Sequence, residues 1–97
     1  MKRIDEIVEE LRRMTPALKR RYPIREIGVF GSYVRGEQTE ESDLDVLVEF
    51  DDRVTLIDFA GLQQDLSDAL GMNVDLVMRS ALKPRIGKRI LAELVPI

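Results

Sequence analysis

The sequence contains no cysteine and no histidine. Without cysteine there can be no disulfide, thiolate zinc site or cysteine nucleophile, and the composition agrees with a reducing, cytoplasmic compartment. Without histidine there can be no Ser-His-Asp triad, no histidine base and no histidine metal site. Any acid–base or metal chemistry in this chain therefore depends on carboxylates, lysine, arginine, tyrosine or serine.

Long apolar runs are also missing, which argues against a membrane-spanning helix. The N-terminal stretch MKRIDEIVEELRR mixes both charge signs, so we do not expect it to be a signal peptide. The 97 residues are 44% hydrophobic and 34% charged, which is the balance of a globular protein with one modest core. We expect a single soluble domain over residues 1–97, without repeats, low-complexity tracts or linkers.

The net charge of −3 conceals two regions of opposite sign. Residues 37–58 contain nine acidic residues and one basic residue, whereas residues 79–97 contain five basic residues and one acidic residue. The mildly acidic total argues against a dedicated nucleic-acid binder. The basic segment can face phosphate or an acidic partner, although a solvated helix face is the simpler interpretation for most of its cations.

Hydrophobic spacing predicts three helices. The first covers residues 2–14, and Pro16 beyond it either kinks the helix or starts a second short one. The second begins at a capping box formed by Thr55 and Asp58 and ends before Gly71. The third begins at Pro84. The apolar faces expected for the last two helices consist of Ile57, Leu62, Leu66, Ala69 and Leu70, and of Ile86, Ile90, Leu91 and Leu94.

Three apolar runs predict the strands of a small mixed sheet. They are IREIGVF (residues 24–30), DLDVLVEF (43–50) and NVDLVM (73–78). The polar connection after the first strand leaves room for one helical turn. The expected fold is an α/β or α+β domain, with a three-stranded sheet and helices packed mainly on one face.

The alternation of side chains places three aspartates on one face of this sheet. In the second strand the apolar face consists of Leu44, Val46, Val48 and Phe50. Asp43 and Asp45 take the other face, and aligning the apolar side of the third strand adds Asp75 to them. Carboxylates this close repel one another unless a hard divalent cation with oxygen ligands compensates them. The trio therefore predicts a Mg²⁺ site, although each aspartate alone would be an ordinary exposed strand-end residue.

A Gly31-Ser32 step lies shortly before these aspartates. Glycine allows a bulky group to approach the backbone, and exposed N–H groups with a serine hydroxyl can hold phosphate oxygens. Arg35 is in reach of the same phosphate, with a surface ion pair to Glu37 or Glu40 as the equally weighted alternative. The segment is not a Walker P-loop, because no Gly-Lys-Ser/Thr follows.

Gly31-Ser32, ten further residues and Asp43-x-Asp45 resemble the nucleotidyltransferase signature of the DNA polymerase β superfamily. The string GSYVRGEQTEESDLD is similar to the minimal nucleotidyltransferases of prokaryotes, and the resemblance covers essentially the whole chain. It implies a polymerase β-like fold, ATP as the nucleotide donor and Mg²⁺ as cofactor, with two ions when nucleotide is bound. It further implies that Asp43 and Asp45 ligate the metals and that Gly31 and Ser32 grip the triphosphate. Asp75 would hold the acceptor-side metal and take the acceptor's proton.

The same resemblance implies a biological role. Minimal nucleotidyltransferases are commonly the antitoxin partners of HEPN-domain RNase toxins, and some add AMP to a tyrosine of the toxin. By this analogy we expect a protein adenylyltransferase that modifies a hydroxyl, with tyrosine as the expected residue, of a HEPN toxin. The alternative is a non-catalytic antitoxin that blocks its toxin by direct binding, and a transferase for a small molecule or an RNA end is a third hypothesis.

The resemblance implies a second, helical domain in larger relatives, which we do not expect in this sequence. After Asp75 only about twenty residues remain, enough for one helix. We therefore expect the remaining walls of the pocket to come from a partner, from a homodimer mate or from the acceptor itself.

Overall fold

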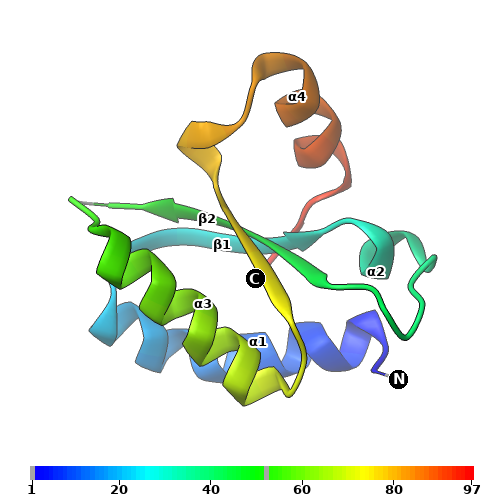
Figure 1. Cartoon of the computed structure of the whole chain (residues 1–97), viewed down its shortest axis with the longest axis horizontal. Helices are drawn as coiled ribbons and strands as arrows, with labels where there is room; N and C mark the ends of the chain where they lie inside the picture. The colour runs from blue at the N-terminus through cyan, green and yellow to red at the C-terminus, as the bar shows by residue number, and fades with distance from the viewer. Residues whose placement is uncertain (1, 52) are drawn as a thin grey trace.

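One mixed sheet organises the computed structural model, which describes residues 2–51 and 53–97 (Figure 1). Its strands are β1 (Ile24–Phe30), β2 (Leu44–Phe50), β3 (Val74–Met78) and β4 (Val95–Pro96). They lie in the order β3-β2-β1-β4, with β2 and β3 parallel and the other two pairs antiparallel. The predicted mixed sheet is confirmed, with one strand more than expected.

The additional strand, β4, is formed where the end of the chain returns to the free edge of β1. Pro96 pairs with Gly28, and Val95 pairs with Val29. A strand of two residues shows no side-chain alternation, so the hydrophobic pattern does not reveal it. Its formation depends on the edge of β1 being available, which is a property of the fold and not of the local sequence.

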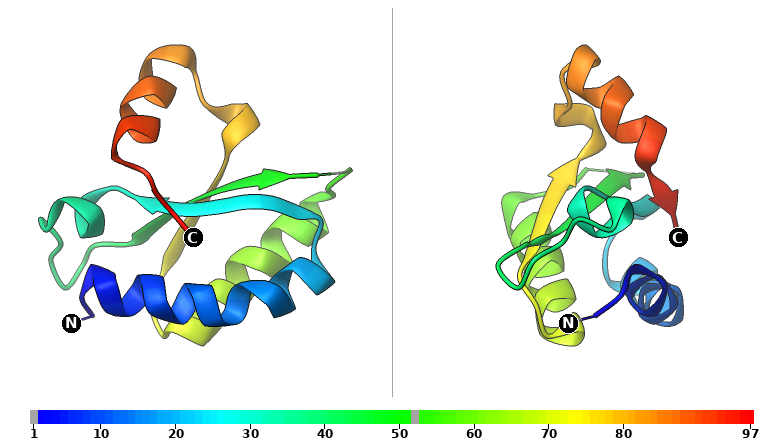
Figure 2. Two further views of the ribbon diagram at one scale, coloured as in Figure 1. Left: turned by 180° about the vertical axis from the view of Figure 1, so that it is seen from behind. Right: turned by 90° about the vertical axis from the view of Figure 1, so that its right-hand side faces the viewer.

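Two long helices cover one face of the sheet, and the last helix stands on the other side (Figures 1 and 2). The helices are α1 (Ile4–Arg21), α2 (Ser32–Arg35), α3 (Leu56–Leu70) and α4 (Pro84–Glu93), with a 3₁₀ turn, η1, at Arg79–Ala81. The long pair, α1 and α3, gives the expected packing mainly on one face. Within the described ranges, no helix is both long and apolar enough to cross a membrane.

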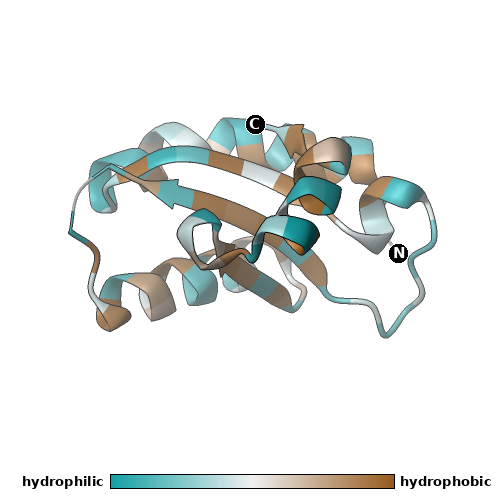
Figure 3. Cartoon of the chain, turned by 90° about the horizontal axis from the view of Figure 1, so that it is seen from above, coloured by the Kyte–Doolittle hydropathy of each residue, from teal (hydrophilic) through white to brown (hydrophobic). Residues whose placement is uncertain are grey.

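The hydrophobic core lies between the sheet and the helices α1 and α3. Leu44, Val46 and Val48 of β2 are fully buried in it, together with Leu66 of α3. Burying one such side chain contributes about 1.5–3 kcal/mol, and Figure 3 shows the central strands as mainly hydrophobic. Because side chains alternate along a strand, this burial directs Asp45 to the opposite face.

α1 is longer than the helix predicted over residues 2–14, because it continues through Pro16 to Arg21. Pro16 is exposed, so water can solvate the carbonyl group that loses its helical hydrogen bond. Leu18, only 4% exposed, extends the buried face beyond the proline. Of the two alternatives left open at Pro16, the start of a second helix is therefore wrong, since core packing outweighs the missing bond.

α3 begins and ends where the sequence predicted. The Thr55 hydroxyl accepts the Asp58 N–H at 3.1 Å, the Asp58 carboxylate accepts the Thr55 N–H at 3.2 Å, and Gly71 ends the helix at a φ of 65°. The predicted apolar face is wrong at Ile57, which is 83% exposed, because the buried residues of α3 begin at Leu62.

Four further residues lie outside the apolar helix faces predicted for them. Ala69 is exposed on α3, although it was expected on the apolar face. On α4, Ile86 is 54% exposed and Leu91 is 39% exposed, and Leu94 follows the end of the helix instead of lying on it. Ala69 lies beside the buried stripe of α3, whereas α4 stands on the other side of the sheet from the core, and Gly87 is its one buried residue within 84–93.

Candidate active site

The parallel pairing of β2 and β3 places two of the predicted aspartates directly opposite each other. Asp45 and Asp75 are register partners, as are Leu44 with Val74 and Val46 with Leu76. The neighbouring pairs are buried, whereas Asp45 is half-buried and Asp75 is exposed. The two carboxylates lie on the same, solvent-facing side of the sheet. They are neighbours there, because adjacent strands are about 4.8 Å apart.

Asp43, the third predicted carboxylate, lies just before β2 and is exposed. It acts electrostatically on the same centre, since the pKa of Asp45 is raised first by burial, then by Asp75, and then by Asp43. Arg35 opposes this rise. The charges of the three aspartates are therefore coupled, and the ionised form of Asp45 is disfavoured in the protein as it stands.

The donor chemistry of this trio fits magnesium, because all of its candidate ligand atoms are carboxylate oxygens and Arg35 compensates the charge of Asp45 only in part. Among residues 2–51 and 53–97, however, no three acidic side chains are already gathered closely enough to hold a metal ion. A metal ligand set would thus have to form by movement of these side chains.

Gly31 lies against the carboxylate of Asp45. Its backbone has a φ of 86° and a ψ of −156°, a conformation adopted almost only by glycine. A Cβ atom at this position would overlap with Oδ2 of Asp45. Gly31 was expected to allow a bulky group to approach the backbone. In the structure it allows the close approach of the Asp45 side chain, and this contact joins the Gly31-Ser32 step, the Gly-Ser corner, to the carboxylates.

Ser32 and Arg35 are the first and last residues of α2, the short helix that follows Gly31. Ser32 is half-buried and Arg35 is exposed. The ion-pair alternative for Arg35 is realised with Glu37, whose carboxylate accepts a hydrogen bond from Nε at 2.8 Å. The guanidinium is also linked to Gly31, because both donate to one carboxylate that the sequence did not predict at this site.

That carboxylate belongs to Glu93, the last residue of α4. Its Oε1 accepts the Gly31 N–H at 2.9 Å and Nη1 of Arg35 at 3.0 Å, and its Oε2 lies 3.2 Å from the same Nη1. Sequence spacing cannot reveal a partner 62 residues away. The available signal was that Glu93 is the one acidic residue in the basic segment 79–97.

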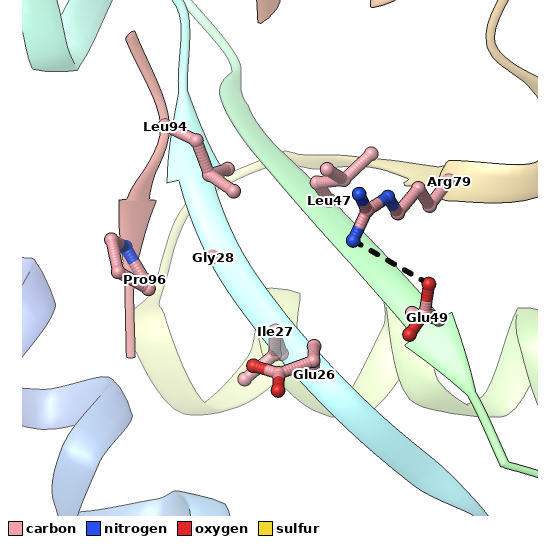
Figure 4. Close-up of a pocket in the computed structure, with 8 residues that line it drawn as sticks. All are labelled: Glu26, Ile27, Gly28, Leu47, Glu49, Arg79, Leu94 and Pro96. Atoms are coloured by element: carbon pink, nitrogen blue, oxygen red, sulfur yellow. Dashed lines mark ion pairs between the residues drawn. The ribbon is translucent and has the colours of Figure 1, made fainter. Parts of the chain in front are cut away.

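A hollow lies over β1 and β2 (Figure 4). It has a volume of about 170 Å³, and Gly28, Leu47, Glu49 and Arg79 are among the residues that line it. An ion pair of 3.5 Å joins Arg79 to Glu49 across it. Since Leu47 and Glu49 follow Asp45 at alternating positions of β2, the hollow and the carboxylates share one surface.

Comparison with known proteins gives consistent matches over nearly the whole chain. Residues 6–97 match the family described as nucleotidyltransferase domain. A protein adenylyltransferase, MntA, from Thermococcus cleftensis is 48% identical over 92 residues, covering 95% of this chain and 93% of the relative. A Methanocaldococcus jannaschii protein, provisionally named a protein adenylyltransferase, is 47% identical and covers 98% of both chains.

Solved structures give the same result at the level of the fold. One, provisionally described as a minimal nucleotidyltransferase, has a TM-score of 0.81 at 39% identity and covers 95% of this chain and 94% of its own. A toxin–antitoxin structure with AMP-PNP has a TM-score of 0.68 at 28% identity, and the match covers 95% of this chain and 69% of that one. A complex of a tri-AMPylated Shewanella oneidensis HEPN toxin with MNT antitoxin has a TM-score of 0.59 at 25% identity. The match covers 95% of this chain and 66% of the matched one.

Proposed function

The chain belongs to the nucleotidyltransferase domain family, and we propose that it transfers AMP from ATP to a hydroxyl group of a partner protein, with Mg²⁺ as cofactor. The observation that carries this proposal is the pairing of Asp45 with Asp75 across β2 and β3, beside the Gly31 corner. The names of the relatives support protein adenylylation, and the neighbour with AMP-PNP supports an adenine nucleotide.

In this reaction the acceptor oxygen forms a bond to the α-phosphorus, and the bond between the α-phosphorus and the bridging oxygen breaks to release pyrophosphate. Asp75 accepts the proton of the hydroxyl. Gly31, Ser32 and Arg35 bind the phosphate oxygens and orient the triphosphate. Asp43, Asp45 and Asp75 would hold the metal, and bound Mg²⁺ supplies charge stabilisation for the attacking and leaving oxygens.

The proposed acceptor is a tyrosine of a HEPN-type toxin, for which the chain serves as antitoxin. Support comes from the structural neighbours, which include a toxin–antitoxin complex in which the HEPN toxin carries AMP. The position of Asp75 is consistent with this proposal, since this residue is exposed and accessible to a side chain of another protein. A second copy of the chain is the other candidate for the missing wall of the pocket.

The test is to incubate the purified chain with the product of its adjacent gene, ATP and Mg²⁺, and to measure the mass of that partner. We expect an increase by whole AMP units, which EDTA prevents. Asp45→Asn and Asp75→Asn should abolish the increase, whereas Asp68→Asn, an exposed position on α3, should retain it. A partner whose mass stays unchanged with the unmodified chain would reject protein adenylylation.

The second candidate function is an antitoxin that acts by binding alone. It is favoured by the lack, among the described residues, of three acidic side chains already gathered for a metal ion. In this case cells that produce the toxin would be protected equally well by the chain and by its Asp45→Asn variant. Loss of protection by a variant present at normal levels would exclude this alternative.

A further inference from the structure

Glu93 satisfies the donors that a nucleotide phosphate would need at the Gly-Ser corner. The Gly31 N–H and Nη1 of Arg35 both donate to its carboxylate, at 2.9 and 3.0 Å. A backbone N–H combined with a guanidinium is a typical binding arrangement for a phosphate oxygen, and a carboxylate meets the same donors with the same charge sign. A triphosphate that uses these two donors must first displace Glu93.

The negative charge of the nearby aspartates makes the position of Glu93 unfavourable for a carboxylate whose role is only structural. Glu93 adds to the negative charge that raises the pKa of Asp45, after the effects of burial, Asp75 and Asp43. Its side chain is only 22% exposed, so water screens this repulsion incompletely. The ion pair with Arg35 and the bond to Gly31 compensate the repulsion in the structure. A bound phosphate would displace Glu93 and accept hydrogen bonds from Gly31 and Arg35 in its place.

Arg35 is arranged so that it can release Glu93 without losing its position. Its Nε is held by Glu37 at 2.8 Å, whereas Glu93 contacts Nη1. Displacement of Glu93 therefore frees one nitrogen of the guanidinium while the other remains fixed. Glu93 itself lies at the end of α4, a helix on the opposite side of the sheet from α1 and α3 (Figure 2).

We infer that Glu93 is a built-in competitor of the nucleotide: its carboxylate holds the Gly31 N–H and Arg35, and it lowers the affinity for triphosphates until it is displaced. This inference rests on the proposed nucleotide site and adds a regulatory residue to it. Any partner or acceptor that draws Glu93 away from the corner would raise the affinity for ATP by the same mechanism.

The test compares the binding of Mg²⁺–AMP-PNP to the unmodified chain and to Glu93→Ala and Glu93→Gln by titration calorimetry. Loss of the competing charge should tighten binding by about tenfold, the effect of one charge-assisted hydrogen bond. The matched control is Glu37→Gln, which removes the same charge from Arg35 but does not touch Gly31. It should leave the affinity unchanged or weaken it, and adenosine should bind equally to all variants.

A second measurement follows the Gly31 N–H directly by amide hydrogen exchange. Its exchange should accelerate in Glu93→Ala and slow again when AMP-PNP is added, while thermal unfolding confirms that each variant is folded. Unchanged or weaker AMP-PNP binding in both Glu93 variants would overturn the inference and identify Glu93 as a positioning residue for Arg35. Failure of every variant, and of the unmodified chain, to bind AMP-PNP would reject the proposed function together with this inference.

Discussion

At the scale of single residues, Gly31 should be the most sensitive backbone position of the site. Replacing it with alanine forces a Cβ into a conformation adopted almost only by glycine, at a cost of about 1–3 kcal/mol in the free energy of unfolding. The same Cβ displaces the Asp45 carboxylate, so we expect loss of nucleotide binding as well. Urea unfolding and AMP-PNP titration measure the two effects.

Gly36 offers a matched control for this substitution. Its φ of 72° is also positive, but a Cβ there would meet no atom within 4 Å. Gly36→Ala should therefore cost about 1–2 kcal/mol in stability and retain nucleotide binding. Equal nucleotide affinities for the two alanine variants would contradict the contact between Gly31 and Asp45.

Tyr22 is expected to make stability depend on pH in the alkaline range. Its hydroxyl donates to Oδ2 of Asp65 at 2.6 Å, and its pKa is raised above 10.0, first by burial and then by this hydrogen bond. A raised pKa in the folded state means that the contribution to stability is complete below pH 10 and is lost as the pH rises further. The loss ends once the pH passes the pKa of the folded protein.

The measurement is the free energy of unfolding between pH 8 and pH 12, for the unmodified chain and for Tyr22→Phe. The variant should be less stable by about 1.5 kcal/mol below pH 10, because it lacks the bond to a charged acceptor. The difference between the two proteins should shrink above pH 10. A constant difference over the whole range would show that the hydrogen bond does not control the titration of Tyr22.

At the scale of elements, the start of α3 is predicted to matter for stability and not for the site. Thr55→Ala removes the hydroxyl that accepts the Asp58 N–H, while the backbone N–H of residue 55 keeps its acceptor, and should lower the free energy of unfolding by about 1 kcal/mol. Nucleotide binding should be unaffected, because α3 covers the face of the sheet opposite to Asp45. A reduced AMP-PNP affinity at full folding would show that the two faces are coupled.

The elements also show which parts of the fold can be predicted from sequence. β2 and β3 were predictable because alternation and apolar content agree over five to seven residues, and Asp45 and Asp75 followed from that alternation. The continuation of α1 through Pro16 and the pairing of β4 were not, because each depends on contacts with distant parts of the chain. Glu93 escaped prediction for the same reason.

At the scale of the whole molecule, the site is expected to reduce stability in the absence of metal. The pKa of Asp45 is raised on folding, so its ionised form favours the unfolded chain at neutral pH and protonation at lower pH relieves this effect. Asp45→Asn should therefore increase the free energy of unfolding in EDTA, by about 0.2–1 kcal/mol, while it abolishes transfer. Urea unfolding measures the change.

Asp68→Asn is the control, because Asp68 is exposed on α3 and accepts a hydrogen bond from Gln64 at 2.8 Å. It should give no gain in stability. If Asp45→Asn is no more stable than the unmodified chain, the repulsion among the three carboxylates is too weak to affect folding, and the electrostatic case for a cation at this site loses its basis.

The strand order has one further consequence for the proposed acceptor. β3 is the outer strand of the sheet, so Asp75 lies at the rim of the molecule and not at the bottom of a cleft. A substrate does not have to enter an interior chamber to reach it. A residue on the surface of a large, fully folded macromolecule can approach this rim from the side, without unwinding or threading any part of its own chain.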